Sequence, residues 1–104
     1  MPVTTIGDAT VHVDIEGFLT EFEEWDERLA TDLATQIGIT LTDAHWKVIR
    51  ILRADYAAQG ETATLRRVSI LAGTPVKDLF TLFPTKPAKK MAYIAGLPKP
   101  HGCV

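Results

Sequence analysis

The chain has 104 residues, of which 46% are hydrophobic and 23% charged, and its formal net charge is −2. This size and composition fit one small soluble domain that needs neither a metal nor a disulfide to fold. The slightly negative charge argues against general attraction to nucleic acid or anionic membranes, and no apolar run is long enough to span a bilayer. The N-terminus lacks the features of a signal peptide, so we expect a cytoplasmic protein.

A short β-hairpin is predicted over residues 3–13. Thr4–Ile6 and Thr10–Val13 are β-prone runs, and Gly7-Asp8 between them is typical of a tight turn. A first helix is then predicted over residues 24–37, because apolar residues recur every fourth position and Gly38 follows as a left-handed stop. These apolar residues are Trp25, Leu29, Leu33 and Ile37.

The next two helices are bounded by capping residues. Thr42 is expected to cap a long helix that ends before Gly60. A shorter helix is predicted over residues 64–72, closed by Gly73.

Two more helices complete the predicted domain. Thr74-Pro75, a hydroxyl followed by proline at the first helical position, should open one that stops at Pro84. Thr85 should begin the last, which Gly96 ends. We expect the aromatic side chains at helical spacing to lie in the core: Trp25, Trp46, Tyr56, Phe80 and Phe83.

The last eight residues, LPKPHGCV, differ from the rest. Pro98 and Pro100 oppose a helix and favour extended backbone, and Gly102 adds freedom next to Cys103. We therefore predict a helical domain over residues 1–96 and a mobile arm over 97–104. Detached, the arm would reach about 25 Å.

Cys103 is the only cysteine, so its thiol can exchange bonds only with other molecules. The neighbouring Val104 carboxylate disfavours the reactive thiolate, whereas Lys99 and His101 favour it. Further activation would come from a partner's basic surface or from cations of the domain, for which Arg50, Arg53 and Arg66 are candidates. No catalytic base is evident, which favours a carrier over a stand-alone enzyme.

Several motifs together resemble one protein family. The C-terminal half has Leu82-Phe83-Pro84, Pro87-Ala88-Lys89, Ile94-Ala95-Gly96-Leu97-Pro98-Lys99-Pro100 and Cys103-Val104. The N-terminal half has Glu16-Gly17-Phe18-Leu19, Trp25, Gly38-Ile39, Leu41-Thr42, His45-Trp46, Arg50, Arg53 and Tyr56. This pattern resembles the DsrC/TusE family over nearly the whole chain.

The resemblance implies a mainly α fold, a small orthogonal helical bundle with an N-terminal β-hairpin and a flexible C-terminal arm. It also implies sulfur trafficking at Cys103. From the residues themselves, we expect Pro98, Lys99, Pro100, His101 and Gly102 to support or tune the thiol. Arg50, Arg53, Arg66 and Lys89 are candidate contacts to anions or partners. The implied partners are sulfur-donor and sulfur-acceptor proteins, such as sulfurtransferases, a tRNA thiolase or a sulfite reductase-type complex.

Two departures from the family pattern affect the expected chemistry. DsrC proteins proper carry a second arm cysteine and take up sulfur as a trisulfide, but this chain has Tyr93 at that position. It therefore resembles the single-cysteine TusE type, which relays persulfide sulfur toward 2-thiouridine in tRNA. The stretch between Arg66 and Leu82 is also shorter than expected, by about one loop, which leaves the specific partner open.

The competing hypothesis is a redox-sensing regulatory or interaction module of the same fold, in which a basic helix pair contacts DNA or a protein. The helices around Gly60 resemble a helix-turn-helix in outline, and Arg66 and Arg67 make this region basic. No cofactor or metal is expected, because the three histidines show no metal-ligand spacing and His45 suits a cap at a helix start. The acidic run of residues 21–27 is interpreted as a solvated face. The sequence does not separate tRNA thiolation from sulfur metabolism or regulation.

Overall fold

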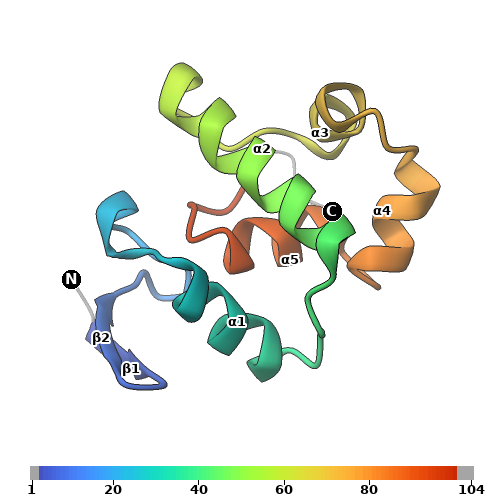
Figure 1. Cartoon of the computed structure of the whole chain (residues 1–104). Helices are drawn as coiled ribbons and strands as arrows, with labels where there is room; N and C mark the ends of the chain where they lie inside the picture. The colour runs from blue at the N-terminus through green and yellow to red at the C-terminus, as the bar shows by residue number, and fades with distance from the viewer. Residues whose placement is uncertain (1–2, 101–104) are drawn as a thin grey trace.

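The computed structural model describes residues 3–100 and has a hairpin packed beside five α-helices (Figure 1). The elements in chain order are β1 (Val3–Ile6), β2 (Ala9–His12), the short 3₁₀ helix η1 (Phe22–Glu24), α1 (Glu27–Gln36), α2 (Asp43–Gln59), α3 (Leu65–Ala72), α4 (Val76–Leu82) and α5 (Pro87–Ile94). The predicted mainly α fold with an N-terminal hairpin is confirmed.

The two strands are antiparallel and paired from Val3 with His12 to Ile6 with Ala9, and Gly7-Asp8 forms the predicted turn. A pair this short is marginal by itself and requires tertiary support. Ile6 and Val11 supply that support by packing on Leu29 and Leu33 of α1. The hairpin therefore covers one side of α1.

Local capping signals set most helix ends where the sequence predicts them. Thr42 and His45 form a reciprocal capping box at the start of α2, and the Thr64 side chain accepts a hydrogen bond from the Arg67 backbone N–H at the start of α3. Gly60 and Gly73 end these helices in the left-handed conformation.

Three details of the helix predictions are wrong. Trp25 lies outside α1, because the Asp26 carboxylate caps that helix through the Leu29 backbone N–H at 2.7 Å. Pro75 is the residue before α4 rather than its first, and the Thr74 side chain does not cap that helix. The last helix begins at Pro87, not Thr85, because the preceding Lys86 has positive φ.

Helix α5 lies at the centre of the molecule and contacts α1, α2 and α4 (Figure 1). Its Met91 and Ile94 are fully buried against Ile49 and Leu52 of α2 and Phe83 after α4. The core prediction for Phe83 is therefore confirmed. Trp25, Trp46 and Tyr56 are only partly buried, and the core prediction for Phe80 is wrong because 46% of its surface is exposed.

Candidate functional site at the base of the C-terminal arm

Four of the eight predicted arm residues, Leu97–Pro100, are described, and we call them the arm base. His101, Gly102 and Cys103 lie outside the described residues. The arm base begins where α5 ends, at the centre of the helical domain. The boundaries of the two predicted parts, 1–96 and 97–104, stay a prediction, but the contacts of the arm base can be built up residue by residue.

The turn between α5 and the arm base is set by Gly96. Its φ is +70°, and the backbone N–H groups of Gly96 and Leu97 donate to the carbonyls of Tyr93 and Ala92 at 3.2 and 3.0 Å. This pair of bonds is a Schellman motif, which favours glycine at the left-handed position. A Cβ at residue 96 would also collide with the Trp25 ring. Leu97 is then fully buried and holds the start of the arm base in the core.

Arg53 of α2 binds the carbonyl groups around this turn. One guanidinium nitrogen, Nη1, donates to the Ala95 carbonyl at 2.8 Å, and Nη2 donates to the Phe22 carbonyl at 2.9 Å. The guanidinium carbon lies 3.9 Å from the Phe22 ring centroid and 4.2 Å from the Trp25 ring centroid. Arg53 therefore joins α2, η1 and the end of α5, with cation–π contacts on two rings.

The aromatic neighbours of Arg53 are themselves fixed. Trp25 Nε1 donates to the Ile94 carbonyl at 2.8 Å, and the Phe22 ring stacks on Tyr56 at a centroid distance of 5.5 Å. Burial lowers the pKa of Arg53 from its usual value, yet a guanidinium stays cationic at neutral pH. A buried charge is costly unless it is hydrogen-bonded, so the two carbonyl acceptors offset the cost of burying the Arg53 guanidinium.

The arm base is also held along its length. The buried Thr62 hydroxyl donates to the Pro98 carbonyl at 2.7 Å, and Lys99 Nζ lies 3.2 Å from Glu16 Oε1. Pro100 is buried as well. Each residue of the arm base thus has a contact with the domain or is buried in it.

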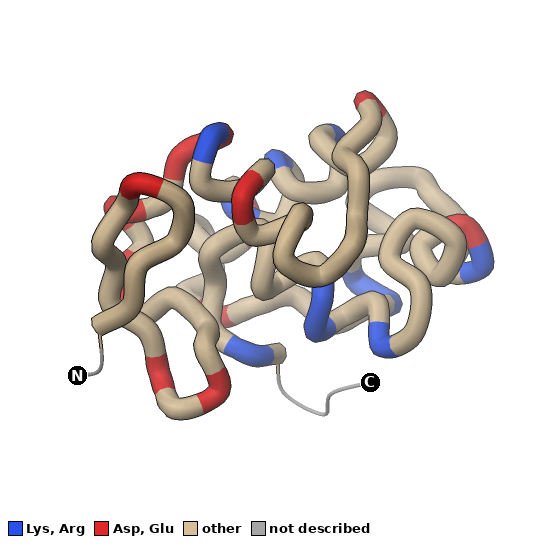
Figure 2. The backbone as a smooth tube through the Cα atoms, turned by 90° about the horizontal axis from the view of Figure 1, so that it is seen from below, with Lys and Arg blue, Asp and Glu red and all other residues tan. Residues whose placement is uncertain are grey.

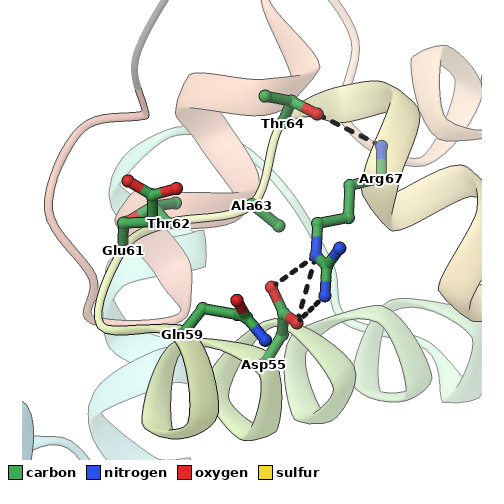
Figure 3. A pocket seen from close by; sticks show the side chains of 7 residues that line it. All are labelled: Asp55, Gln59, Glu61, Thr62, Ala63, Thr64 and Arg67. Atoms are coloured by element: carbon green, nitrogen blue, oxygen red, sulfur yellow. Dashed lines mark hydrogen bonds and ion pairs between the residues drawn. The ribbon is translucent and has the colours of Figure 1, made fainter.

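Beside Thr62 is a small hollow of about 100 Å³ between the end of α2 and the start of α3 (Figure 3). Arg67 binds Asp55 through two nitrogens there, with Nη2 at 2.7 Å from Oδ1 and Nε at 3.0 Å from Oδ2. These hydrogen bonds lower the pKa of Asp55 and raise that of Arg67. The charges neutralise each other, so we interpret this hollow as a structural junction of α2 and α3.

Tyr93, the residue that the sequence analysis compared with a second arm cysteine, lies on α5 and is partly buried. Its ring packs edge-on against Phe18 at 5.9 Å, and its hydroxyl donates to Gln36 Oε1 at 3.4 Å. Burial raises the pKa of the phenol, so it stays neutral at physiological pH. Tyr93 also lines a hollow of about 330 Å³, together with Lys89 and Glu16. A neutral phenol offers no sulfur for an internal bond.

The predicted cations do not gather at one point. Arg50 is exposed, pairs with Glu27 at 3.1 Å and lies over the Trp46 ring, while Arg66 is exposed on α3. Arg53 points its two Nη atoms at backbone carbonyls. Anion binding by Arg50, Arg53, Arg66 and Lys89 stays a prediction.

Part of the expected acidic face has structural roles. Glu24 accepts a hydrogen bond from the His12 backbone N–H at 2.8 Å, which lowers the pKa of Glu24, and its other oxygen contacts the His12 ring at 2.7 Å. Asp26 caps α1 and Glu27 pairs with Arg50. His45 is the cap that the sequence predicts, and its Nε2 also contacts the Leu82 carbonyl at 2.7 Å.

Sequence reasoning missed Thr62 and the structural role of Arg53. Thr62 meets a carbonyl 36 positions away, and Arg53 meets one 42 positions away, so no local spacing could signal either contact. Glu16 stood among the residues that carry the family resemblance, without an assigned role. Within residues 3–100, no three His, Cys, Asp or Glu side chains gather as metal ligands, and no helix is long and apolar enough to cross a membrane.

Comparison with known proteins decides the family. The family model described as "DsrC like protein" matches residues 5–104, a range that includes both the arm base and Cys103. The chain belongs to the DsrC-like family. This confirms the resemblance drawn from the sequence motifs.

Three relatives show how similar this DsrC-like chain is to known members of the family. It is 40% identical over 101 residues to Sulfurtransferase TusE of Sodalis glossinidius (strain morsitans), covering 90% of this chain and 94% of that protein. The oxidized gamma-subunit of the dissimilatory sulfite reductase (DsrC) from Archaeoglobus fulgidus is 37% identical, with a TM-score of 0.79 over 99% of this chain and 100% of that one. DsrC of Allochromatium vinosum is 33% identical, with a TM-score of 0.85 over 98% and 97% of the two chains.

Proposed function

We propose that this DsrC-like protein is a single-thiol sulfur carrier that works through Cys103. The observation that carries the proposal is the combination of one cysteine in the whole chain with a family match that extends through it. The names of two relatives, a sulfurtransferase and the gamma-subunit of a dissimilatory sulfite reductase, support sulfur transfer as the general role.

The proposed transfer balances without an added oxidant. The Cys103 thiolate attacks the outer sulfur of a donor persulfide, and a new S–S bond forms at Cys103. The donor's S–S bond breaks, and its electron pair leaves with the inner sulfur as a thiolate. The acceptor's thiolate then repeats this attack on the Cys103 persulfide and releases Cys103. The single cysteine supports this scheme, because the chain provides no second thiol to discharge the sulfur internally.

The arm base gives the carrier a defined starting point. The contacts of Leu97–Pro100 with the domain fix where the arm leaves it. Release of the Thr62 and Lys99 contacts would free residues of the arm base from the domain.

The proposed setting is a cytoplasmic relay between a donor and an acceptor protein. The TusE relative favours delivery toward tRNA 2-thiolation, and the DsrC relatives favour sulfur metabolism. Lys99 and His101 are proposed to favour the thiolate, while Pro98, Pro100 and Gly102 let the end of the arm enter a partner's cleft.

Intact-mass measurement tests the carrier proposal directly. The purified protein, treated with a small-molecule persulfide donor, should gain one sulfur, about 32 mass units, as expected for persulfide formation. Reduction should remove the added mass. The Cys103→Ser protein is the matched control and should gain nothing. Absence of the gain in the native chain, or its persistence in the serine variant, would rule out Cys103 as the carrier.

A further inference from the structure

Large exposed apolar side chains are concentrated in one short part of the chain. Six such side chains occur among residues 3–100, and four of them fall within residues 70–80. These four are Ile70, Leu71, Val76 and Phe80, with Ile70 74% exposed and Phe80 46% exposed. Exposed apolar residues are ordinary when scattered, but a concentration of them commonly marks an interaction site.

The four side chains belong to two helices that touch. Helices α3 and α4 are in contact, joined by the turn at residues 73–75, and lie together at one end of the molecule (Figure 1). Val68 and Ala72 of α3 and Leu79 of α4 are buried and provide the inward faces. Ile70, Leu71, Val76 and Phe80 are therefore spare apolar surface, which the domain does not use for its core. We call them the α3–α4 face.

The charges beside the α3–α4 face are mainly positive. Arg66 lies one turn before Ile70, and Lys77 lies between Val76 and Phe80; neither forms an ion pair with another residue in the described range. Arg67 is already neutralised by Asp55, and Asp78 is the one acidic residue on these two helices. The apolar face thus has two available cations beside it.

This local charge is part of a division across the chain. Residues 1–40 hold nine of the thirteen Asp and Glu residues but one of the eleven Lys and Arg residues, although the whole chain is nearly neutral. Figure 2 shows the same separation along the backbone, with most red segments on the side of the N-terminus and most blue segments elsewhere. A partner that approaches the α3–α4 face therefore meets a positive region of a negatively charged protein.

We propose that the α3–α4 face is a docking surface for an acidic, amphipathic segment of a partner protein. Apolar side chains of the partner would cover Ile70 and Phe80, and its carboxylates would approach Arg66 and Lys77. Nucleic acid fits less well, because phosphates gain nothing from four apolar side chains. A second copy packed symmetrically on the same face would place the cations of the two copies near each other.

The docking proposal does not involve the thiol. The proposal concerns binding alone and holds whether or not Cys103 carries sulfur. It can therefore be tested in the Cys103→Ser protein, which also removes disulfide-linked dimers. Failure of docking would not change the persulfide measurement on the native chain. Failure to form a persulfide would not change the docking measurement.

The test is a titration of ¹⁵N-labelled Cys103→Ser protein followed by NMR. The probes are a synthetic amphipathic helical peptide with leucines on one face and glutamates on the other, a lysine version of it, and a scrambled glutamate version. The glutamate amphipathic peptide should shift resonances of residues 65–82 and bind at least tenfold more tightly than either other peptide. Equal binding of all three peptides, or shifts confined to other residues, would overturn the proposal.

Two sets of variants identify the surface. Ile70→Ser with Phe80→Ser should weaken binding of the glutamate peptide at least tenfold, whereas Val3→Ser with Ile15→Ser removes exposed apolar groups elsewhere and should leave binding unchanged. Arg66→Glu with Lys77→Glu should reverse the preference toward the lysine peptide. Unchanged binding in the Ile70→Ser, Phe80→Ser variant would overturn the proposal. An equal loss of binding in the Val3→Ser, Ile15→Ser variant would overturn it as well.

Two further measurements cover the competing occupants. Sedimentation equilibrium should show a monomer at the concentrations used for NMR. A double-stranded DNA fragment should leave the resonances of residues 65–82 unshifted at physiological salt. Self-association lost on changing Ile70 and Phe80, or DNA binding lost on changing Arg66, would assign the face to another occupant and overturn the proposal.

Discussion

The arm base and the α3–α4 face differ in how far their groups are used inside the fold. At the end of α5, Arg53 and Trp25 donate to the carbonyls of Ala95 and Ile94. In the arm base that follows, Thr62 donates to the Pro98 carbonyl and Leu97 is buried. At the α3–α4 face, four large apolar side chains are exposed to water, while other residues of the same two helices form the buried side. The difference separates a region that holds the start of the arm in place from one that the folded chain leaves available for binding.

The largest effect on this contrast is expected from Arg53→Met. The variant keeps an apolar stem between Phe22 and Trp25 but leaves the carbonyls of Ala95 and Phe22 without their charged donor. We expect the free energy of unfolding to fall by about 3 kcal/mol, since each hydrogen bond to a charged group contributes about 1.5–3 kcal/mol. Urea denaturation measures the change. Arg50→Met, at an exposed position on the same helix, should change stability by less than about 0.5 kcal/mol. Equal effects of the two variants would contradict the assigned role of Arg53.

The next effect is expected from Gly96→Ala. The alanine Cβ would collide with Trp25 in addition to the cost of a positive φ, so we expect a loss of about 2 kcal/mol or more. Gly60→Ala is the matched control, because φ is +78° there and the added Cβ meets nothing within 4 Å. It should cost about 1 kcal/mol in thermal or urea unfolding. A Gly96 variant no less stable than the Gly60 variant would show that the Trp25 contact does not limit this turn.

Thr62→Val is expected to have a smaller effect. The valine keeps the shape of the side chain but removes the donor to the Pro98 carbonyl, for an expected loss of about 1 kcal/mol. NMR resonances of Lys99 should shift as the arm base loosens. Thr5→Val, on the exposed side of β1, is the control and should leave those resonances unchanged. An unaltered Lys99 environment in the Thr62 variant would mean that other contacts alone hold the arm base.

The smallest effect is expected at the α3–α4 face itself. Phe80→Ala should change the free energy of unfolding by about 0.5 kcal/mol, whereas Leu79→Ala, one position earlier and fully buried, should cost about 3 kcal/mol. Denaturant titrations of the two variants side by side make the comparison. A large loss in the Phe80 variant would mean that this ring belongs to the core after all.

Helix ends were the most predictable part of the fold. Thr42, Thr64, Gly60 and Gly73 act within three or four residues of their own position, so their chemistry can be read from the chain alone. The sequence analysis wrongly placed Trp25 inside the first helix, because the apolar residues at every fourth position include it. Its ring is instead held by the Ile94 carbonyl and by Arg53, both far along the chain.

Phe80 shows the limit of periodicity in a short helix. Phe80 and Phe83 are both aromatic and only three residues apart, yet one is exposed and the other fully buried. Spacing identifies residues that share a face but not which faces meet a neighbour. Helix α4 buries Leu79 inward, and the chain after its end turns Phe83 into the core beside His45.

The amino-acid sequence by itself determined the family, the hairpin, the number of helices and the single thiol that the proposed chemistry uses. These features depend on residue identity and short spacing. Only the tertiary structure decided what holds the arm base and where apolar surface remains. Arg53 with Ala95, Thr62 with Pro98, and α3 with α4 meet through folding of the whole chain, so their pairing depends on three-dimensional packing that no local pattern encodes.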